Sequence, residues 1–421
     1  MSNAAASAGA RSVEEMVAVR SAANAAFFAQ EAQRLGRLCH QMAERFARGG
    51  RLVAFGRSPA ARSDARHVAV EFVHPVIVGK RALPAIGLTA EGGDLGAQAQ
   101  LLTRPEDIAI AFGADEDGGE AARAIGLARA RGCLTIAFAP AGAGWEFEPP
   151  VPDRDVRQEL IETLYHVLWE LVHVFFEHRG LLEGRESTRG HDAGASSFLY
   201  PFLDEREDNL EQVLEDVSRS VSMKAHEIGA LREQTLSDNA DTLAAAARAL
   251  RAMLDRGGTL LALGNGGSAT DAMDVTADFR SGDVGAVCAR GSVEACAGGG
   301  GAPEAARAWP AIDLTEDSAI VTAIANDIGA EAIFARQVIA YGRSGDALLA
   351  LSTSGNSPNV ITALAEGRRR GLLTIAMVGY DGGRIATQRL ADYVIVTRSE
   401  HIPRIQEAQA SAYHVLRKLV G

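Results

Sequence analysis

The sequence predicts an α/β fold with two tandem domains. Each is expected to be a parallel sheet flanked by helices on both faces (a doubly wound sheet), with long helices at its N-terminal side. The chain has 421 residues, 47% of them apolar and 23% charged, which is enough for a sizeable core and two or three domains. Sequence blocks recur in the two halves of the chain. Short uninterrupted apolar segments alternate with helical stretches, which is typical of parallel strands buried on both faces.

Four sequence blocks recur in the same order along the chain. RGGRLVAFG from Arg48, for example, matches RGGTLLALG from Arg256. The paired blocks start at Arg48 and Arg256, Asp64 and Asp271, Arg131 and Arg370, and Arg157 and Arg404. This order indicates an internal duplication, whose copies we call the first and the second repeat. We expect a first domain over residues 1–183, a polar linker over 184–200, and a second domain over 201–421.

Both repeats have the same predicted order of elements. Long amphipathic helical regions are expected over 13–48 and 210–256. Strands are expected over 52–55, 108–112 and 134–138 in the first repeat, and over 260–263, 347–351, 374–378 and 393–396 in the second. A turn of small residues and a helix follow the first strand of each repeat. Ligands of such sheets bind beyond the carboxyl ends of the strands, so these turns are the expected place for a site.

Composition excludes several classes of protein. The net charge of −12 argues against a general nucleic-acid or anionic-membrane surface. No apolar run approaches the roughly 18 residues of a membrane span. The four cysteines are far apart and form no Cys-x-x-Cys pair, so we expect a reduced, cytoplasmic chain with neither a disulfide scaffold nor a zinc knuckle. Residues 1–10, rich in Ala, Ser and Gly, are interpreted as a frayed tail rather than a signal peptide.

Two loops of the second repeat have the composition of a phosphate site. The first, over 264–268, is Gly-Asn-Gly-Gly-Ser between a strand and a helix, where a backbone can approach an anion closely. The second, over 352–358, has four hydroxyl groups and a proline suited to the first turn of a helix. Capping a helix requires only one or two hydroxyl groups. Two such loops after two strands predict a site that binds a phosphate without lysine.

These loops, with TAIANDIGAEAIFARQV from Thr322 and RIQEA from Arg404, resemble the sedoheptulose 7-phosphate isomerases (phosphoheptose isomerases) of the SIS (sugar isomerase) superfamily. The resemblance covers most of the second repeat and, more weakly, the first, where GKRALPAIGLT from Gly79 also fits. It implies that each domain has the SIS fold and that the protein binds a sugar phosphate. The residues expected to bind substrate or its phosphate are Asn265, Gly266, Ser268, Asp327, Ser352, Thr353, Ser354, Ser357, Gln406 and His414.

The resemblance also implies an acid–base and metal set. In that family the helix after the first loop carries His and, four residues on, Glu, while the C-terminal helix carries Gln and, eight residues on, His. These residues are expected to bind zinc, with Glu and the second His transferring protons. Residues at i and i+4 share a helix face, and i and i+8 do so less closely. The first repeat has the whole set as His67, Glu71, Gln158 and His166, with Glu71 and His166 as the catalytic pair. Such a set suits Zn²⁺ and also other divalent ions.

The two repeats differ in what they keep. The second has Asp274 and Asp278 in place of His and Glu, and Pro403 where the family has Asp. The first has lost the phosphate loops, because its second loop carries three carboxylates over 115–117 that would repel a phosphate. One repeat therefore keeps the phosphate loops, and the other keeps the acid–base set. Active sites of the resembling family lie between subunits, so a composite site is feasible.

The leading hypothesis is a phosphosugar aldose–ketose isomerase of the phosphoheptose type, working by enediol proton transfer. Its metal set is either the four first-repeat residues or a mixed set, such as His67 and Glu71 with Gln406 and His414. The alternative is a non-catalytic sugar-phosphate-binding regulator or scaffold. A third interpretation, a glucosamine-6-phosphate synthase or glucokinase-regulator type with two such domains, has less support, because no glutaminase region with an N-terminal cysteine nucleophile precedes the repeats. We expect a homo-oligomer (a dimer, equivalent to four SIS domains), and neither a nucleic-acid nor a membrane partner.

Overall fold

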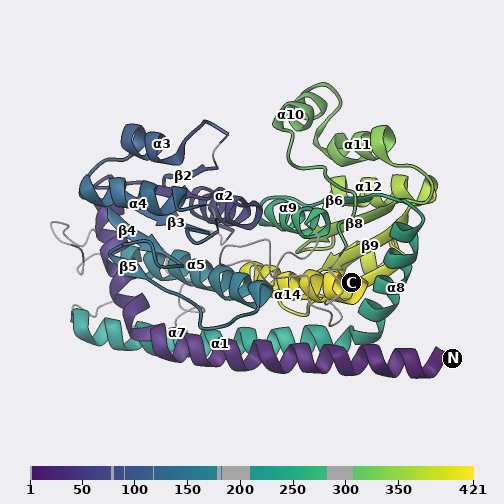
Figure 1. Ribbon diagram of the computed structural model, residues 1–421, viewed down its shortest axis with the longest axis horizontal. Helices are drawn as coiled ribbons and strands as arrows, with labels where there is room; N and C mark the ends of the chain where they lie inside the picture. Colours follow the sequence, from purple (N-terminus) through teal and green to yellow (C-terminus); the bar gives the residue numbers. More distant parts are fainter. Residues whose placement is uncertain are drawn as a thin grey trace, which may run out of the picture. The chain divides into compact units, whose positions relative to one another are not determined.

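The computed structural model describes residues 2–76, 80–89, 91–116, 118–177, 182, 209–281 and 307–421 (Figure 1). They form two compact units. The first unit comprises Glu15–Gln234 and His401–Ser411, and the second comprises Thr235–Glu400 with Met1–Glu14 and Ala412–Gly421. The linker expected over 184–200 lies outside the described residues, so the domain limits at 183 and 201 stay predictions.

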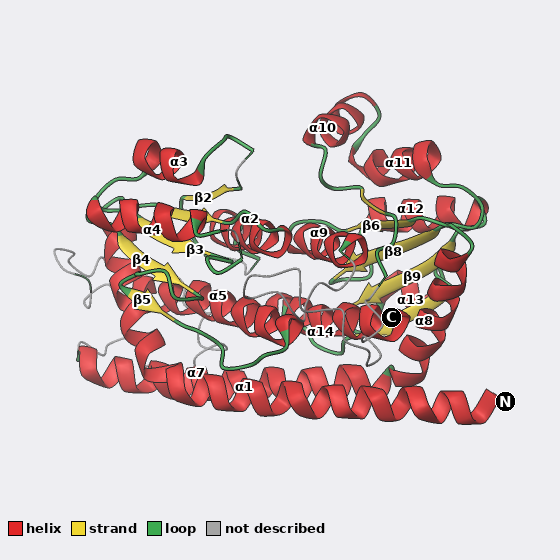
Figure 2. Cartoon of the chain, viewed as in Figure 1, coloured by secondary structure: helices red, strands yellow, loops and turns green. Residues whose placement is uncertain are grey.

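The first unit is built on a five-stranded parallel sheet of order β2-β1-β3-β4-β5 (Figure 2). Its strands are β1 (Leu52–Phe55), β2 (Ala85–Leu88), β3 (Ile108–Ala111), β4 (Leu134–Ala137) and β5 (Trp145–Glu146). In register, Leu52 of β1 lies opposite Ala85 of β2 and Ile108 of β3.

Helices cover both faces of this sheet. Alternate strand residues point to opposite faces, so Leu52 and Ala54 join one core and Val53 and Phe55 the other. The first core is completed by α1 (Ser2–Ala47), α2 (Pro59–Val73), α5 (Arg154–Glu177) and α7 (Leu210–Asp238). The second is completed by α3 (Leu95–Leu102) and α4 (Glu120–Ala130).

The second unit repeats this plan with the strand order β10-β9-β8-β6-β7, also parallel. Its strands are β6 (Leu260–Leu263), β7 (Ala311–Asp313), β8 (Ala347–Ser352), β9 (Leu373–Val378) and β10 (Tyr393–Val396). Its helices are α8 (Ala240–Asp255), α9 (Gly267–Arg280), α10 (Ser318–Asp327), α11 (Ile333–Tyr341), α12 (Pro358–Arg369), α13 (Gly383–Thr387) and the C-terminal part of α14 (Ile402–Val420). In order of sequence, β6 to β10 occupy the places of β1 to β5. The predicted doubly wound α/β fold is confirmed.

Three features differ from the sequence-based expectation. The strands β2, β5 and β7 were not predicted, because each is an edge strand with partly buried residues, and β5 and β7 are only two and three residues long. The expected helix over 210–256 is divided into α7 and α8 at Asn239, whose side chain donates to Val396 O (3.0 Å) and accepts from Val396 N (3.1 Å). The N-terminal residues expected to be a tail are helical from Ser2. Among the described residues, no helix is long and apolar enough to cross a membrane.

Candidate functional site

The turns expected to bind ligand lie at the place where the order of strands reverses in each sheet. In the second unit this place is between β6 and β8, which pair directly, with Leu263 opposite Ala350. The corresponding strands of the first unit are β1 and β3. Chain connections leave such neighbouring strands in opposite directions, which opens a crevice beyond their carboxyl ends. The loops after β6 and β8 are the two predicted phosphate loops.

The loop after β6 requires its glycines. A side chain at Gly264 would place Cβ 2.1 Å from Ser268 O, and Gly266 has φ +59°, in the left-handed region. Gly266 directly precedes α9, and Ser268 is buried in its first turn. Asn265 and Asn359 exchange two amide hydrogen bonds of 3.0 and 2.9 Å, which tie this loop to the start of α12. The close backbone approach that a phosphate loop needs is therefore present.

Hydroxyl groups gather in the loop after β8. Ser352 Oγ lies 3.2 Å from Ser357 Oγ and accepts a hydrogen bond from Gly355 N at 3.2 Å. Ser354 Oγ accepts from Asn356 N, also at 3.2 Å, and Thr353 lies between these serines. Asp327, by contrast, is exposed at the end of α10, where it accepts a hydrogen bond from Asn326. A role in phosphate binding stays a prediction for all of these residues.

The corresponding loops of the first unit are paired internally. Ser58 caps α2 and its hydroxyl donates to Glu116 at 2.8 Å. Asp115 forms an ion pair of 2.9 Å with Arg157. Asp115, Glu116 and Arg157 border a cavity of about 200 Å³. Its lining also includes Ala60, Asp64, Phe112, Phe138 and Gln158. Carboxylates thus occupy the place that serine hydroxyls have in the second unit.

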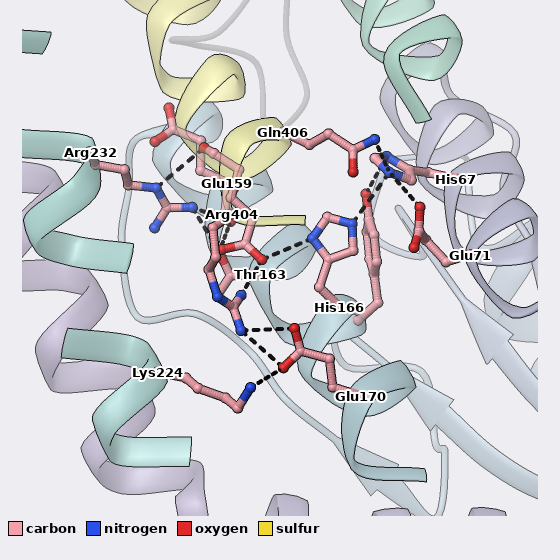
Figure 3. Close-up of polar contacts among 12 residues, drawn as sticks. His67, Glu71, Glu159, Thr163, His166, Glu170, Lys224, Arg232, Arg404 and Gln406 are labelled. Carbon is pink, nitrogen blue, oxygen red and sulfur yellow. Dashed lines mark hydrogen bonds and ion pairs between the residues drawn. The ribbon is translucent and has the colours of Figure 1, made fainter. Parts of the chain in front are cut away.

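A buried cluster of polar side chains lies in the helical layer of the first unit (Figure 3). His67 of α2 and His166 of α5 face each other, with 3.3 Å between their Nε2 atoms. Gln406 of α14 places its amide nitrogen 3.5 Å from His67 Nε2, and Glu71 places Oε1 3.9 Å from the same atom. We call these four residues the His67 centre. They come from both repeats, because α14 belongs to the second.

Further polar groups hold the two histidines in place. The Tyr165 hydroxyl shares a hydrogen bond of 2.9 Å with His67 Nδ1. His166 Nδ1 donates to Glu407 Oε1, also at 2.9 Å. Beyond Glu407, a chain of buried ion pairs continues through Arg404 to Glu170 and Lys224 (Figure 3). Burial disfavours ionisation of Glu170, but Arg404 and Lys224 outweigh it and lower its pKa to about 2.

The surroundings of the His67 centre shift the pKa values of its acid–base groups. Burial, reinforced by neighbouring His166, lowers the pKa of His67 well below its usual range, so this imidazole is neutral. Burial raises the pKa of Glu71 to about 7, although His166 opposes the shift. Both protonation states of Glu71 are therefore populated near neutral pH, which is the property a group needs to accept and return a proton.

The residues of the His67 centre fit a divalent cation. Two nitrogens bound to one tetrahedral Zn²⁺ lie about 3.3 Å apart, the separation of the two Nε2 atoms. Glu71 Oε2 and Gln406 Oε1 are buried and have no hydrogen-bond donor within the described part of the chain. Ligand atoms of His67, His166 and the neighbouring Glu162 lie within 4.8 Å of one another. His67, Glu162 and His166 would hold the ion, and Glu71 and Gln406, which lie beside His67 Nε2, would complete its set of ligands.

This grouping is a mixed set of the two repeats, but it has His166 in the place of His414. Gln158 precedes His166 by two helical turns, a rise of about 12 Å along α5, and lines the cavity described above. His414 lies in the second unit with Nε2 3.6 Å from Asp278 Oδ2, and its neighbour Tyr413 donates to Asp274 at 3.5 Å. Of Gln406 and His414, the two residues expected from the second repeat, the structure places Gln406 beside His67.

Sequence reasoning missed three residues near this centre. Glu162 lies one turn before His166 on the same face of α5, a spacing that could have indicated it. Tyr165 precedes His166, and the Tyr-His pair recurs as Tyr413 and His414. Glu407 follows Gln406 within RIQEA, but nothing in its spacing indicates a partner in the other repeat.

Comparisons with known proteins agree with this fold. A family model described as SIS domain matches residues 225–286 and 292–379. The C-terminal domain of glucosamine-fructose-6-phosphate aminotransferase from Francisella tularensis superposes with a TM-score of 0.57 at 8% identity, covering 97% of this chain and 94% of that one. Tagatose-6-phosphate ketose/aldose isomerase from Escherichia coli gives a TM-score of 0.55 at 11% identity, covering 97% and 91%. The fold and the paired repeats define a protein of the SIS superfamily with two SIS-like regions.

Sequence relatives narrow this class. The phosphoheptose isomerase of Solidesulfovibrio magneticus is 36% identical over 206 residues, which cover 49% of this chain and 90% of the relative. That of Pelodictyon phaeoclathratiforme is 41% identical over 191 residues, which cover 45% and 82%. The chain therefore belongs to the phosphoheptose isomerase family, as the resemblance in its motifs predicted.

Proposed function

We propose that this protein is a phosphosugar aldose–ketose isomerase that transfers protons through an enediol, with the His67 centre as its acid–base site. The observation that carries the proposal is the placement of Glu71, with a pKa of about 7, beside two buried histidines. The phosphoheptose isomerases among its relatives support the same reaction class. By that relationship, a seven-carbon ketose phosphate such as sedoheptulose 7-phosphate is the first substrate to test.

The reaction requires one group for the carbon-bound proton and one for the hydroxyl proton. We assign Glu71 to remove the proton from the carbon beside the carbonyl and return it to the former carbonyl carbon. In the ion-free centre we assign His166 to move the proton between the two oxygens of the enediol, because its Nε2 faces the same point as His67 Nε2. No proton is gained or lost over the cycle, as an isomerisation requires. A divalent ion held by the centre would stabilise the negative charge that develops on the enediol oxygens.

We further propose that serine loops of the second repeat bind the phosphate of the substrate. The support is local: the loop after β8 presents the hydroxyls of Ser352, Ser354 and Ser357 beside backbone N–H groups. Hydroxyls and helix N-termini bind phosphate without a cationic side chain, which suits a chain of net charge −12. That these loops and the acid–base set of the first repeat serve one substrate stays a prediction from the sequence.

Proton exchange in D₂O, followed by NMR, tests the proposal. The full chain, with and without added Zn²⁺, is given sedoheptulose 7-phosphate and a panel of aldose and ketose phosphates. We expect deuterium to enter beside the carbonyl, and Glu71→Gln to abolish this exchange. Ser354→Ala should raise KM more than it lowers kcat. Saturable binding without exchange for every sugar phosphate would instead establish the non-catalytic binding protein.

A further inference from the structure

We propose that Glu407, from the second repeat, is the positioning residue of His166, from the first: its carboxylate holds the proton of that imidazole on Nδ1 and turns Nε2 toward His67. The assignment concerns a contact within the first unit, to which both residues belong. Its consequence for turnover rests on the proposed function, whereas its consequence for the imidazole and for metal binding does not.

The contact determines which nitrogen carries the proton. His166 Nδ1 lies 2.9 Å from Glu407 Oε1, and both side chains are fully buried. A neutral imidazole has one N–H, and a carboxylate can only accept a hydrogen bond, so the proton is held on Nδ1. The lone pair of Nε2 then points toward His67 Nε2, which lies 3.3 Å away. Metal-binding histidines are commonly oriented by a carboxylate on the other ring nitrogen.

The ion pairs behind Glu407 keep its carboxylate in place. Arg404, three residues earlier on α14, forms an ion pair with Glu407 Oε1 and places Nη2 3.1 Å from both carboxylate oxygens of Glu170. Lys224 of α7 pairs with Glu170 from the other side. Arg232, also on α7, donates to the backbone oxygen of Glu407 at 3.4 Å. The charge of Glu407 is therefore compensated, and its side chain is held on both the backbone and the carboxylate side.

The duplication provides an internal comparison. Glu159 follows Gln158 in the first repeat as Glu407 follows Gln406 in the second. It is equally buried, but it pairs with Arg20 at 2.8 Å and accepts a hydrogen bond from Ser411 at 2.6 Å. The two carboxylates thus have the same place in their repeats and different partners. Glu159 is the matched control for Glu407.

The experiment uses three variants of the full chain. Glu407→Leu removes both the acceptor and the charge, Glu407→Gln keeps an acceptor oxygen and removes the charge, and Glu159→Gln is the control. The first readout is the tautomer of His166 in chelator-treated protein, from long-range ¹H–¹⁵N correlations with the signal assigned by His166→Asn. The second is Zn²⁺ affinity from competition with a chelator. Thermal unfolding identifies any variant that does not fold.

We expect the Nδ1–H tautomer in the wild type, in Glu407→Gln and in Glu159→Gln, and its loss in Glu407→Leu. Zn²⁺ affinity should fall by about 10- to 100-fold in both Glu407 variants and remain unchanged in Glu159→Gln. With a sugar phosphate that the wild type isomerises, Glu407→Gln should lower kcat and leave KM unchanged.

Either of two results overturns the proposal: a folded Glu407→Leu that keeps both the tautomer and the Zn²⁺ affinity, or an equal loss of affinity in Glu159→Gln. If no sugar phosphate turns over while the tautomer and affinity results hold, the proposed function fails and the positioning role stands. Failure of one proposal is therefore distinguishable from failure of the other.

Discussion

We predict that the glutamine that takes part in metal binding beside His67 is Gln406, from the second repeat, and not Gln158, from the first. Gln158 and Gln406 occupy the same place in the two repeats, and both are buried, with 8% and 2% of their surface exposed. Of the two, Gln406 is the one that lies beside His67, with its amide nitrogen 3.5 Å from His67 Nε2. Rotating that amide about its last bond presents Oε1, the atom with ligand chemistry, to the same point.

The magnitude follows from what each substitution removes. Gln406→Ala removes one of the groups that would bind the ion, and we expect Zn²⁺ affinity to fall by at least about 10- to 100-fold, or about 1.4–2.7 kcal/mol. Gln158→Ala deletes a side chain about 12 Å along the helix from His166 and should leave the affinity unchanged. The assay is chelator competition on the full chain, with thermal unfolding as the control for folding. A lower Zn²⁺ affinity in Gln158→Ala with an unchanged affinity in Gln406→Ala would refute the reasoning. It would favour the metal set that comes wholly from the first repeat.

Three further predictions concern stability and the serine loop. Arg404 and Lys224 lower the pKa of Glu170 to about 2. At pH values above the usual pKa of a glutamate, the ionised side chain should therefore contribute about 3 kcal/mol to the free energy of unfolding, and this contribution should be lost as the pH falls toward 2. The stability difference between wild type and Glu170→Gln, measured by urea unfolding, should therefore narrow between pH 5 and 3; a constant difference would contradict this. Gly355→Ala should abolish sugar-phosphate binding measured by calorimetry, because φ is +62° and its Cβ would lie 2.3 Å from Gly382 O, whereas Gly126→Ala, in open space on α4, should not. Phe28 is a residue of α1 whose side chain is buried in the core. Phe28→Ala should lower the free energy of unfolding by about 3–5 kcal/mol, and a decrease below about 1 kcal/mol would show that α1 is not packed as described.

The repeats have diverged in complementary ways. The second keeps the glycine and serine loops, while its acid–base positions are Asp274 and Asp278. The first keeps His67 and Glu71, while its loops are occupied by internally paired carboxylates such as Asp115. After a duplication each copy can lose what the other supplies. The His67 centre shows this most clearly, because its glutamine comes from the second repeat.

The sequence by itself determined the elements and their kind. Uninterrupted apolar segments such as Leu52–Phe55 and Leu260–Leu263 became central strands with the predicted limits, because burial on both faces leaves a pattern that is local in the chain. The Gly and Ser loops were also visible, since a close turn requires particular residue types. The edge strand Trp145–Glu146 was not visible, because two residues form a strand only through a neighbour.

Tertiary structure alone decided which residues meet. Gln406 reaches His67 across 339 positions of sequence, and Glu407 reaches His166 across 241. A duplicated sequence offers two equivalent glutamines and two equivalent glutamates, and the pattern of one helix does not say which will face a given histidine. Helical spacing favoured Gln158 with His166, but Gln158 lines the cavity described above, and the glutamine found beside His67 is Gln406. The packing of α14 against α2 and α5 within the first unit supplied Gln406 instead, because a site buried between helices is completed by whichever side chains their docking brings together.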